Sequence, residues 1–147
     1  MRKPLVPTTV GLDPDRRQID PAVSKAAAAI LVVEDDRGSQ QYIEVLLGNK
    51  YRLYFAESVT GARQVLSAIG ACELILLDLS LDGEEDGLDL VRFLKNQEKW
   101  RQIPIVVTSA HVFIADKERC LSAGCVDYLT KPLARNKLLE CVEHWIS

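Results

Sequence analysis

One short apolar run limits what this chain can fold into. Residues 74–77 read Leu-Ile-Leu-Leu and lead directly into a single carboxylate, Asp78. A continuous apolar run of this length is typical of a strand that is buried on both faces, as in a parallel sheet. Ligands of open parallel sheets bind at the carboxyl ends of the strands, so we expect Asp78 to lie at the floor of a binding site.

The remainder of the chain repeats this pattern, because strand-like and helix-like segments alternate with short connections from residue 29 to residue 146. The predicted strands are 29–33, 52–56, 74–78, 105–109 and 126–129, and the predicted helices are 39–47, 58–69, one from about Leu88, 113–123 and 133–146. Such alternation predicts a three-layer α/β fold, a doubly wound parallel (βα)5 sheet with helices on both faces.

The first 27 residues do not share this alternation. They hold four of the six prolines and carry five basic and three acidic groups, without a sustained apolar period. We therefore expect residues 1–27 to form a flexible or loosely packed arm, and residues 28–147 to form a single domain.

Composition argues against several classes of protein. The formal net charge of −3 provides no basic surface for nucleic acid, and no stretch approaches the roughly 20 apolar residues of a membrane span. No apolar segment of a signal peptide follows Arg2 and Lys3. The four cysteines lack Cys-x-x-Cys spacing, so we expect reduced, packed thiols in a cytoplasmic protein.

Three carboxylates, Glu34, Asp35 and Asp78, stand at the ends of two predicted strands. If these strands are neighbours, the acids converge, and clustered carboxylates need a cation or shifted pKa values. Mg²⁺ suits such oxygen ligands. The fourth strand ends in two hydroxyl residues, 108–109, and Lys131 follows the fifth strand. A carboxylate nucleophile, a metal, a hydroxyl and an ammonium are the groups that phosphoryl transfer requires.

Five stretches, found in order, resemble the receiver domain of two-component response regulators of the CheY type. They are residues 30–36 (Ile-Leu-Val-Val-Glu-Asp-Asp), 74–79 (Leu-Ile-Leu-Leu-Asp-Leu), 86–87 (Asp-Gly), 103–110 (Ile-Pro-Ile-Val-Val-Thr-Ser-Ala) and 127–133 (Asp-Tyr-Leu-Thr-Lys-Pro-Leu). The resemblance runs from about Ala29 to Ile146 and implies a flavodoxin-like strand order, 2-1-3-4-5. Residues 116–125 most resemble receivers of hybrid histidine kinases and their single-domain relatives.

The resemblance also implies a metal site and a phosphorylation site. Asp78 would be the phosphoacceptor and would form an acyl phosphate. Asp35 and Asp78 would bind Mg²⁺ directly, the backbone carbonyl of Ser80 would complete the protein ligands, and Glu34 would act through a bound water.

Further residues would read out the phosphoryl group. Lys131 would pair with it, the Lys131–Pro132 bond would be cis, and Tyr128 would be an aromatic switch that turns inward on activation. Counting five residues from the proline that opens the fourth strand, or 22 back from Lys131, identifies Ser109 as the switch hydroxyl. Thr108 is the alternative.

The implied function is that of a phosphoacceptor in a phosphorelay. A sensor histidine kinase or a histidine phosphotransfer protein would donate the phosphoryl group, and an unknown downstream protein would bind in response. The chain would act as a monomer or weak dimer and would catalyse nothing beyond its own phosphorylation and dephosphorylation. We expect no output domain after the last predicted helix, so the chain would signal by binding.

Two alternatives belong to other classes. A pseudo-receiver would bind proteins without phosphorylation, but the full set of acids and Lys131 argues against it. An aspartate-nucleophile phosphatase of the haloacid dehalogenase type would need a second Asp where Ser80 stands.

The loop at residues 81–87 departs from the receiver pattern. Asp82 stands where the family usually has proline, and Asp86 and Gly87 come one residue later than in the family pattern. The loop contains four acidic residues. We interpret the loop as a solvated turn, or alternatively as a segment that tunes metal affinity or the choice of kinase.

Overall fold

A computed structural model describes residues 27–81, 87–110 and 114–146. The elements are β1 (Ala29–Val33), α1 (Arg37–Leu47), β2 (Arg52–Ala56), α2 (Val59–Ile69), β3 (Leu74–Asp78), α3 (Gly87–Lys95), β4 (Ile105–Ser109), α4 (Ile114–Ala123), β5 (Asp127–Thr130) and α5 (Arg135–Ile146). All strand pairs are parallel and the sheet has the order β2-β1-β3-β4-β5. The predicted fold class and strand order are therefore confirmed.

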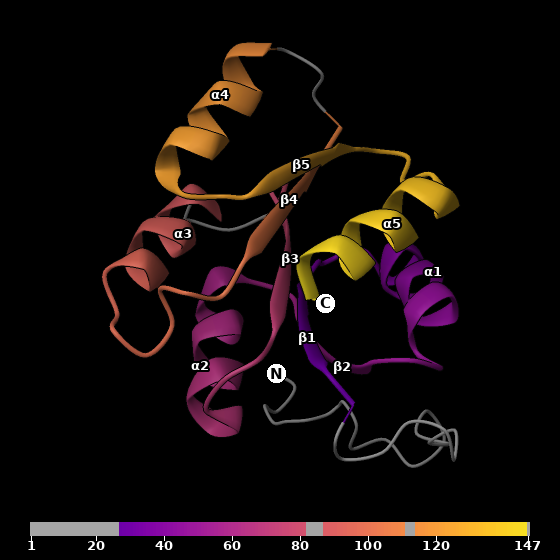
Figure 1. The fold of residues 1–147 in the computed structure, drawn as a ribbon, viewed down its shortest axis with the longest axis horizontal. Helices are drawn as coiled ribbons and strands as arrows, with labels where there is room; N and C mark the ends of the chain where they lie inside the picture. Colours follow the sequence, from indigo (N-terminus) through magenta and orange to yellow (C-terminus); the bar gives the residue numbers. More distant parts are fainter. Residues whose placement is uncertain (1–26, 82–86, 111–113, 147) are drawn as a thin grey trace.

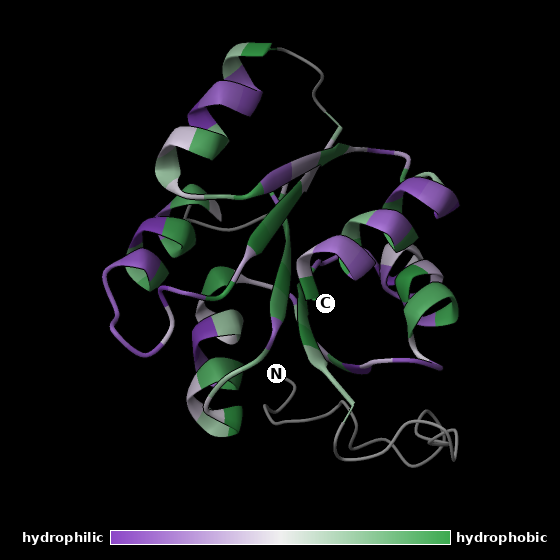
Figure 2. Ribbon diagram, viewed as in Figure 1, coloured by the Kyte–Doolittle hydropathy of each residue, from purple (hydrophilic) through white to green (hydrophobic). Residues whose placement is uncertain are grey.

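The sheet lies between two layers of helices. In Figure 1, α1 and α5 lie together on one side of the sheet, and α2, α3 and α4 lie on the other. Every residue of the inner strands β1, β3 and β4 is buried. This burial on both faces explains why their sequences are continuously apolar, as the strongly hydrophobic colouring of these strands in Figure 2 shows.

Alternation along the strands divides the core into two clusters. Leu74 and Leu76 belong to the cluster beneath α1 and α5, whereas Ile75 and Leu77 belong to the cluster beneath α2, α3 and α4. All four are essentially inaccessible to solvent. Burying a side chain of this size contributes about 1.5–3 kcal/mol, so the burial of these four residues strongly stabilises β3.

Local capping sets several helix boundaries. Asp36 caps α1 by accepting a bond from the Ser39 amide at 2.8 Å, so the helix begins two residues before the predicted start. Ser58 caps α2 in the same way, and α2 ends at Gly70, whose φ of 86° favours glycine. At the other end of the chain, β5 begins one residue later than predicted. The helix α5 begins two residues later than predicted, because the turn that carries Pro132 occupies the connection before it.

The cysteines and a tryptophan are among the buried side chains. All four cysteines are buried and none forms a disulfide, as expected. Trp100 is buried in the core and its indole donates to the Gly70 carbonyl at 2.9 Å. None of the helices within the described residues is long and apolar enough to cross a membrane. The proposed arm, apart from Ala27, and the acids at 82–86 lie outside the described residues.

Candidate functional site

The predicted acids meet at the carboxyl edge of the sheet. Glu34 and Asp35 follow β1, and Asp78 is the last residue of β3, which pairs directly with β1. One carboxylate oxygen from each of the three residues lies within 4.8 Å of the other two. Glu34 and Asp78 are almost fully buried, whereas Asp35 is half-buried.

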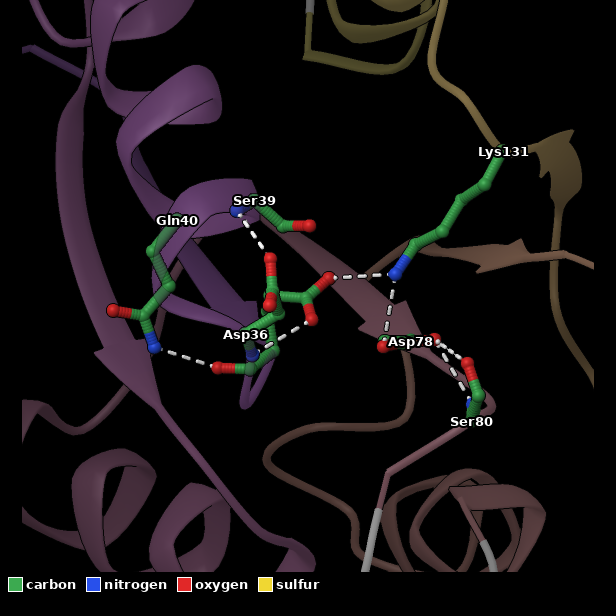
Figure 3. Close-up of polar contacts among 7 residues, drawn as sticks. Asp36, Ser39, Gln40, Asp78, Ser80 and Lys131 are labelled. Atoms are coloured by element: carbon green, nitrogen blue, oxygen red, sulfur yellow. Dashed lines mark hydrogen bonds and ion pairs between the residues drawn. The ribbon is translucent and has the colours of Figure 1, made fainter.

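A lysine that follows the edge strand β5 provides the positive charge. Figure 3 shows Lys131 extending from the connection after β5 toward Asp78. Its Nζ donates to Asp78 Oδ2 at 3.0 Å and to Glu34 Oε1 at 2.9 Å. The backbone amide of Lys131 donates to the carbonyl of Ser109 at 2.7 Å, and the Lys131–Pro132 bond is cis as expected. The cation and both buried acids therefore form one charge cluster.

Asp78 is held as a carboxylate. Burial alone would raise its pKa, but the backbone amide and hydroxyl of Ser80 donate to Oδ1 at 2.9 and 2.7 Å, and Lys131 donates to Oδ2. These bonds outweigh the desolvation and lower the pKa of Asp78. An ionised carboxylate at the end of a strand is the form that can act as a nucleophile.

Glu34 behaves differently although it shares Lys131. Desolvation by burial is the largest influence and raises its pKa, against the bonds from Lys131 and from the Asp36 amide. Lys131 in turn has a raised pKa, because its two acidic partners outweigh its own desolvation. The neighbourhood thus favours the charged forms of Asp78 and Lys131, and penalises the charge on Glu34.

The connection between β1 and α1 is fixed by hydrogen bonds that sequence analysis did not identify. The amide of Asp36 donates to Glu34 Oε2 at 3.0 Å, and Nε2 of Gln40 donates to the Glu34 carbonyl at 2.6 Å. Gln40 is 6% exposed. The signal was present in its spacing, since Gln40 precedes Ile43 by three residues and Leu47 by seven, and therefore lies on the buried face of α1.

The two candidate hydroxyls lie on opposite faces of β4. Thr108 pairs with Asp78 across the sheet, and its other neighbour in register is Leu129, from the cluster beneath α1 and α5. Ser109 alternates to the face of Val107, whose partner in register is Tyr128. Tyr128 is half-buried and packs against the cluster beneath α2, α3 and α4, to which Val107 belongs. Both hydroxyl residues are buried.

Close packing behind Asp78 explains the glycine that begins α3. Gly87 is buried, and a Cβ there would lie 3.1 Å from Leu79 Cδ2 and 3.6 Å from the Asp78 carbonyl. A larger residue would press on the segment that carries Asp78. The neighbouring acidic loop, 82–86, lies outside the described residues, so its predicted roles stay predictions.

The donor set fits a hard divalent cation. Three carboxylates at one edge offer oxygen ligands, and Mg²⁺ is normally held by one or two carboxylates while keeping several waters. Ser80 donates to Asp78 through its amide and its hydroxyl. That the Ser80 carbonyl binds the metal stays a prediction.

Comparison with known proteins agrees with this geometry. A family model of the response regulator receiver domain matches residues 30–143. The chain belongs to this family. It is a CheY-like receiver domain of two-component signalling systems, and such domains generally serve as signalling modules and not as enzymes.

Individual relatives show how far the similarity extends. The KDP operon transcriptional regulatory protein KdpE of Escherichia coli is 36% identical over 112 residues, which cover 74% of this receiver and 47% of KdpE. This receiver therefore spans about half the length of that relative. The activity of the longer protein does not transfer to it.

Solved structures of receivers superpose closely. The receiver domain of a sensor histidine kinase from Pseudomonas aeruginosa, which holds a magnesium ion in its active-site cleft, is 33% identical with a TM-score of 0.71, covering 82% of this chain and 98% of that one. The phosphorylated cyanobacterial phytochrome response regulator RcpA is 26% identical with a TM-score of 0.71, covering 83% of this chain and 96% of that one.

Proposed function

We propose that this receiver accepts a phosphoryl group from a phospho-histidine onto Asp78, with Mg²⁺ bound beside it. One observation carries the proposal. A buried, ionised carboxylate at a strand end lies 3.0 Å from the ammonium of Lys131 and within 4.8 Å of two further acids. This arrangement combines a nucleophile with the positive groups that neutralise a phosphoryl group in transfer.

In the proposed reaction, a carboxylate oxygen of Asp78 attacks phosphorus in line with the bond to the donor imidazole. The new P–O bond forms as the P–N bond breaks, and the imidazole nitrogen keeps the electron pair. Lys131 then pairs with a phosphoryl oxygen in place of the carboxylate oxygen it now contacts. Bound Mg²⁺ would neutralise part of the phosphoryl charge.

The same residues would hold the metal. Asp35 and Asp78 would be direct ligands, with the Ser80 carbonyl, and Glu34 would contribute through a water. The half-buried position of Asp35 and the burial of Glu34 support this division. Replacing Asp35 by Ala should weaken the stabilisation that Mg²⁺ produces in a thermal melt. An unchanged response would remove Asp35 from the metal site.

Phosphorylation would be read out by Ser109 and Tyr128, and would change the surface that a downstream protein binds. The donor would be a sensor histidine kinase or a histidine phosphotransfer protein. We place the protein in the cytoplasm, with proteins and not nucleic acid or membrane as its partners. Its own phosphorylation and dephosphorylation would be the only reactions it catalyses.

Phosphorylation with acetyl phosphate or a phospho-histidine protein in the presence of Mg²⁺ tests the proposal. The wild type should take up one phosphoryl group and Asp78→Asn should take up none, since an amide is a poor nucleophile. Asp36→Asn is a matched control, because Asp36 is exposed, belongs to the same acidic triplet, and caps α1 in a way that Asn can replace. Labelling of Asp78→Asn, or no labelling of the wild type, would refute the proposal, and the second result would favour a pseudo-receiver.

A further inference from the structure

A buried side chain outside the charge cluster holds the segment that carries the metal ligands. Gln40 projects from the first turns of α1 and is 6% exposed. Figure 3 shows its amide directed at the segment around Asp36. Its Nε2 donates to the carbonyl of Glu34 at 2.6 Å, in a buried position where water does not compete for the bond.

The accepting oxygen belongs to the peptide unit that joins Glu34 to Asp35. Because a peptide unit is planar, a bond that fixes this carbonyl also fixes the directions of the two α-carbons that flank it. Asp35 is a candidate direct ligand of the metal, and Glu34 is a candidate to contact it through a water. One hydrogen bond from Gln40 therefore sets the orientation of two acids.

Neighbouring peptide units are fixed by other means. The amide of Glu34 donates to the Ala56 carbonyl at 2.9 Å, which extends the pairing of β1 with β2. The amide of Asp36 donates to the carboxylate of Glu34 itself, so that bond is sensitive to whatever Glu34 binds. The first of these bonds joins two backbone groups, and the second uses the carboxylate of a candidate metal-site residue. Only the third, from Gln40, is made by a side chain that has no proposed contact with the metal.

We propose that Gln40 is a positioning residue of the metal site, which orients Glu34 and Asp35 for a divalent cation through the peptide unit between them. This inference rests on the proposed function, since it assumes that the acids bind Mg²⁺. Side chains that orient metal ligands by hydrogen bonding to them typically contribute about 10–100-fold to metal affinity. We expect the lower end of this range here, because Gln40 acts on the backbone and not on a carboxylate.

Isothermal titration of the metal-free protein with Mg²⁺ tests the proposal in wild type, Gln40→Met and Gln64→Met. Met keeps the unbranched shape and approximate volume of Gln but cannot donate, and it adapts well to cores. Gln64 is an exposed residue of α2, remote from the acids, and serves as the matched control. We expect the Mg²⁺ dissociation constant to rise about tenfold in Gln40→Met and to stay at the wild-type value in Gln64→Met.

Thermal melts without metal separate positioning from simple loss of stability. A purely structural role would lower the melting temperature of Gln40→Met while leaving its Mg²⁺ dissociation constant unchanged, and that result would overturn the proposal. If Gln40→Met does not fold, Gln40→Ala, which also loses the donor and introduces no new polar group, should show the same weakened binding. Absence of Mg²⁺ binding by the wild type would instead refute the metal site of the proposed function, and the inference with it.

Discussion

The ammonium of Lys131 lies 3.0 Å from the carboxylate of Asp78, although 53 residues separate them in the chain. The same ammonium lies 2.9 Å from Glu34, so a single cation balances two acids that are each at most 3% exposed. The side chain of Lys131 is itself 21% exposed. The two acids are therefore buried, whereas the lysine that pairs with them is partly exposed. Loss of the lysine would leave two poorly solvated negative charges.

Replacing Lys131 by Met should destabilise the metal-free protein. Removing one partner of a buried ion pair leaves its partners uncompensated, and we expect the free energy of unfolding to fall by about 1–3 kcal/mol. Mg²⁺ should then raise the melting temperature more in this variant than in the wild type, because the metal replaces the missing charge. Lys137→Met, at an exposed position of α5, is the control. Equal stability of Lys131→Met and the wild type without metal would contradict the prediction.

Replacing Glu34 by Gln should stabilise the metal-free protein at neutral pH. Burial raises the pKa of Glu34, so the folded state favours the protonated form and is weakened as pH rises through that pKa. The advantage of Gln should therefore shrink as pH falls from the raised pKa of folded Glu34 toward about 4.3, the pKa of Glu in an unfolded chain, and should be absent below that pH. Melting temperatures in EDTA from pH 3.5 to 7.5 measure it, with the exposed Glu98→Gln as control. A less stable Glu34→Gln at pH 7 would show that the bond to Lys131 outweighs the desolvation.

Ser109, not Thr108, should couple the phosphoryl group to Tyr128. Ser109 shares its face of β4 with the neighbour of Tyr128, whereas Thr108 faces the cluster beneath α1 and α5. We expect Ser109→Ala to accept phosphate but to lose phosphorylation-dependent partner binding, a coupling of about 1–3 kcal/mol. Thr108→Val should keep it. Affinity for a confirmed partner with and without beryllofluoride measures the coupling, and the reverse result would move the switch hydroxyl to Thr108.

The proposed arm, residues 1–27, should be dispensable for folding and for phosphoryl chemistry. Their proline content and lack of apolar periodicity predict little contribution to a core. A chain that begins at Lys25 should melt within about 4 °C of the full length, the shift that about 1 kcal/mol produces in a domain of this size. Its rate of labelling by acetyl phosphate should be unchanged. A much larger loss of stability would mean that the arm packs on the domain.

Much of the site could be located from the sequence because each acid ends a buried strand. The run before Asp78 is apolar on both faces, and this alone places the strand inside a parallel sheet and its last residue at the ligand-binding edge. The capping bonds of α1 and α2 are equally local, since Asp36 and Ser58 accept from amides three residues away. Hydrophobic periodicity and helix caps depend on residues that are close in the chain, so both can be recognised without knowledge of the fold.

Tertiary structure decided what those residues do to one another. No local pattern in the sequence shows that Lys131 donates to both Glu34 and Asp78. Nor does any local pattern show that Gln40 donates to the carbonyl of Glu34. The opposite pKa shifts of Glu34 and Asp78 also arise from burial and from donors brought by folding. The sequence by itself determined the elements, their order and the identity of the reactive groups, because these follow from short-range pattern. The distances that make the groups act together depend on strand order and register, which exist only once the sheet has formed.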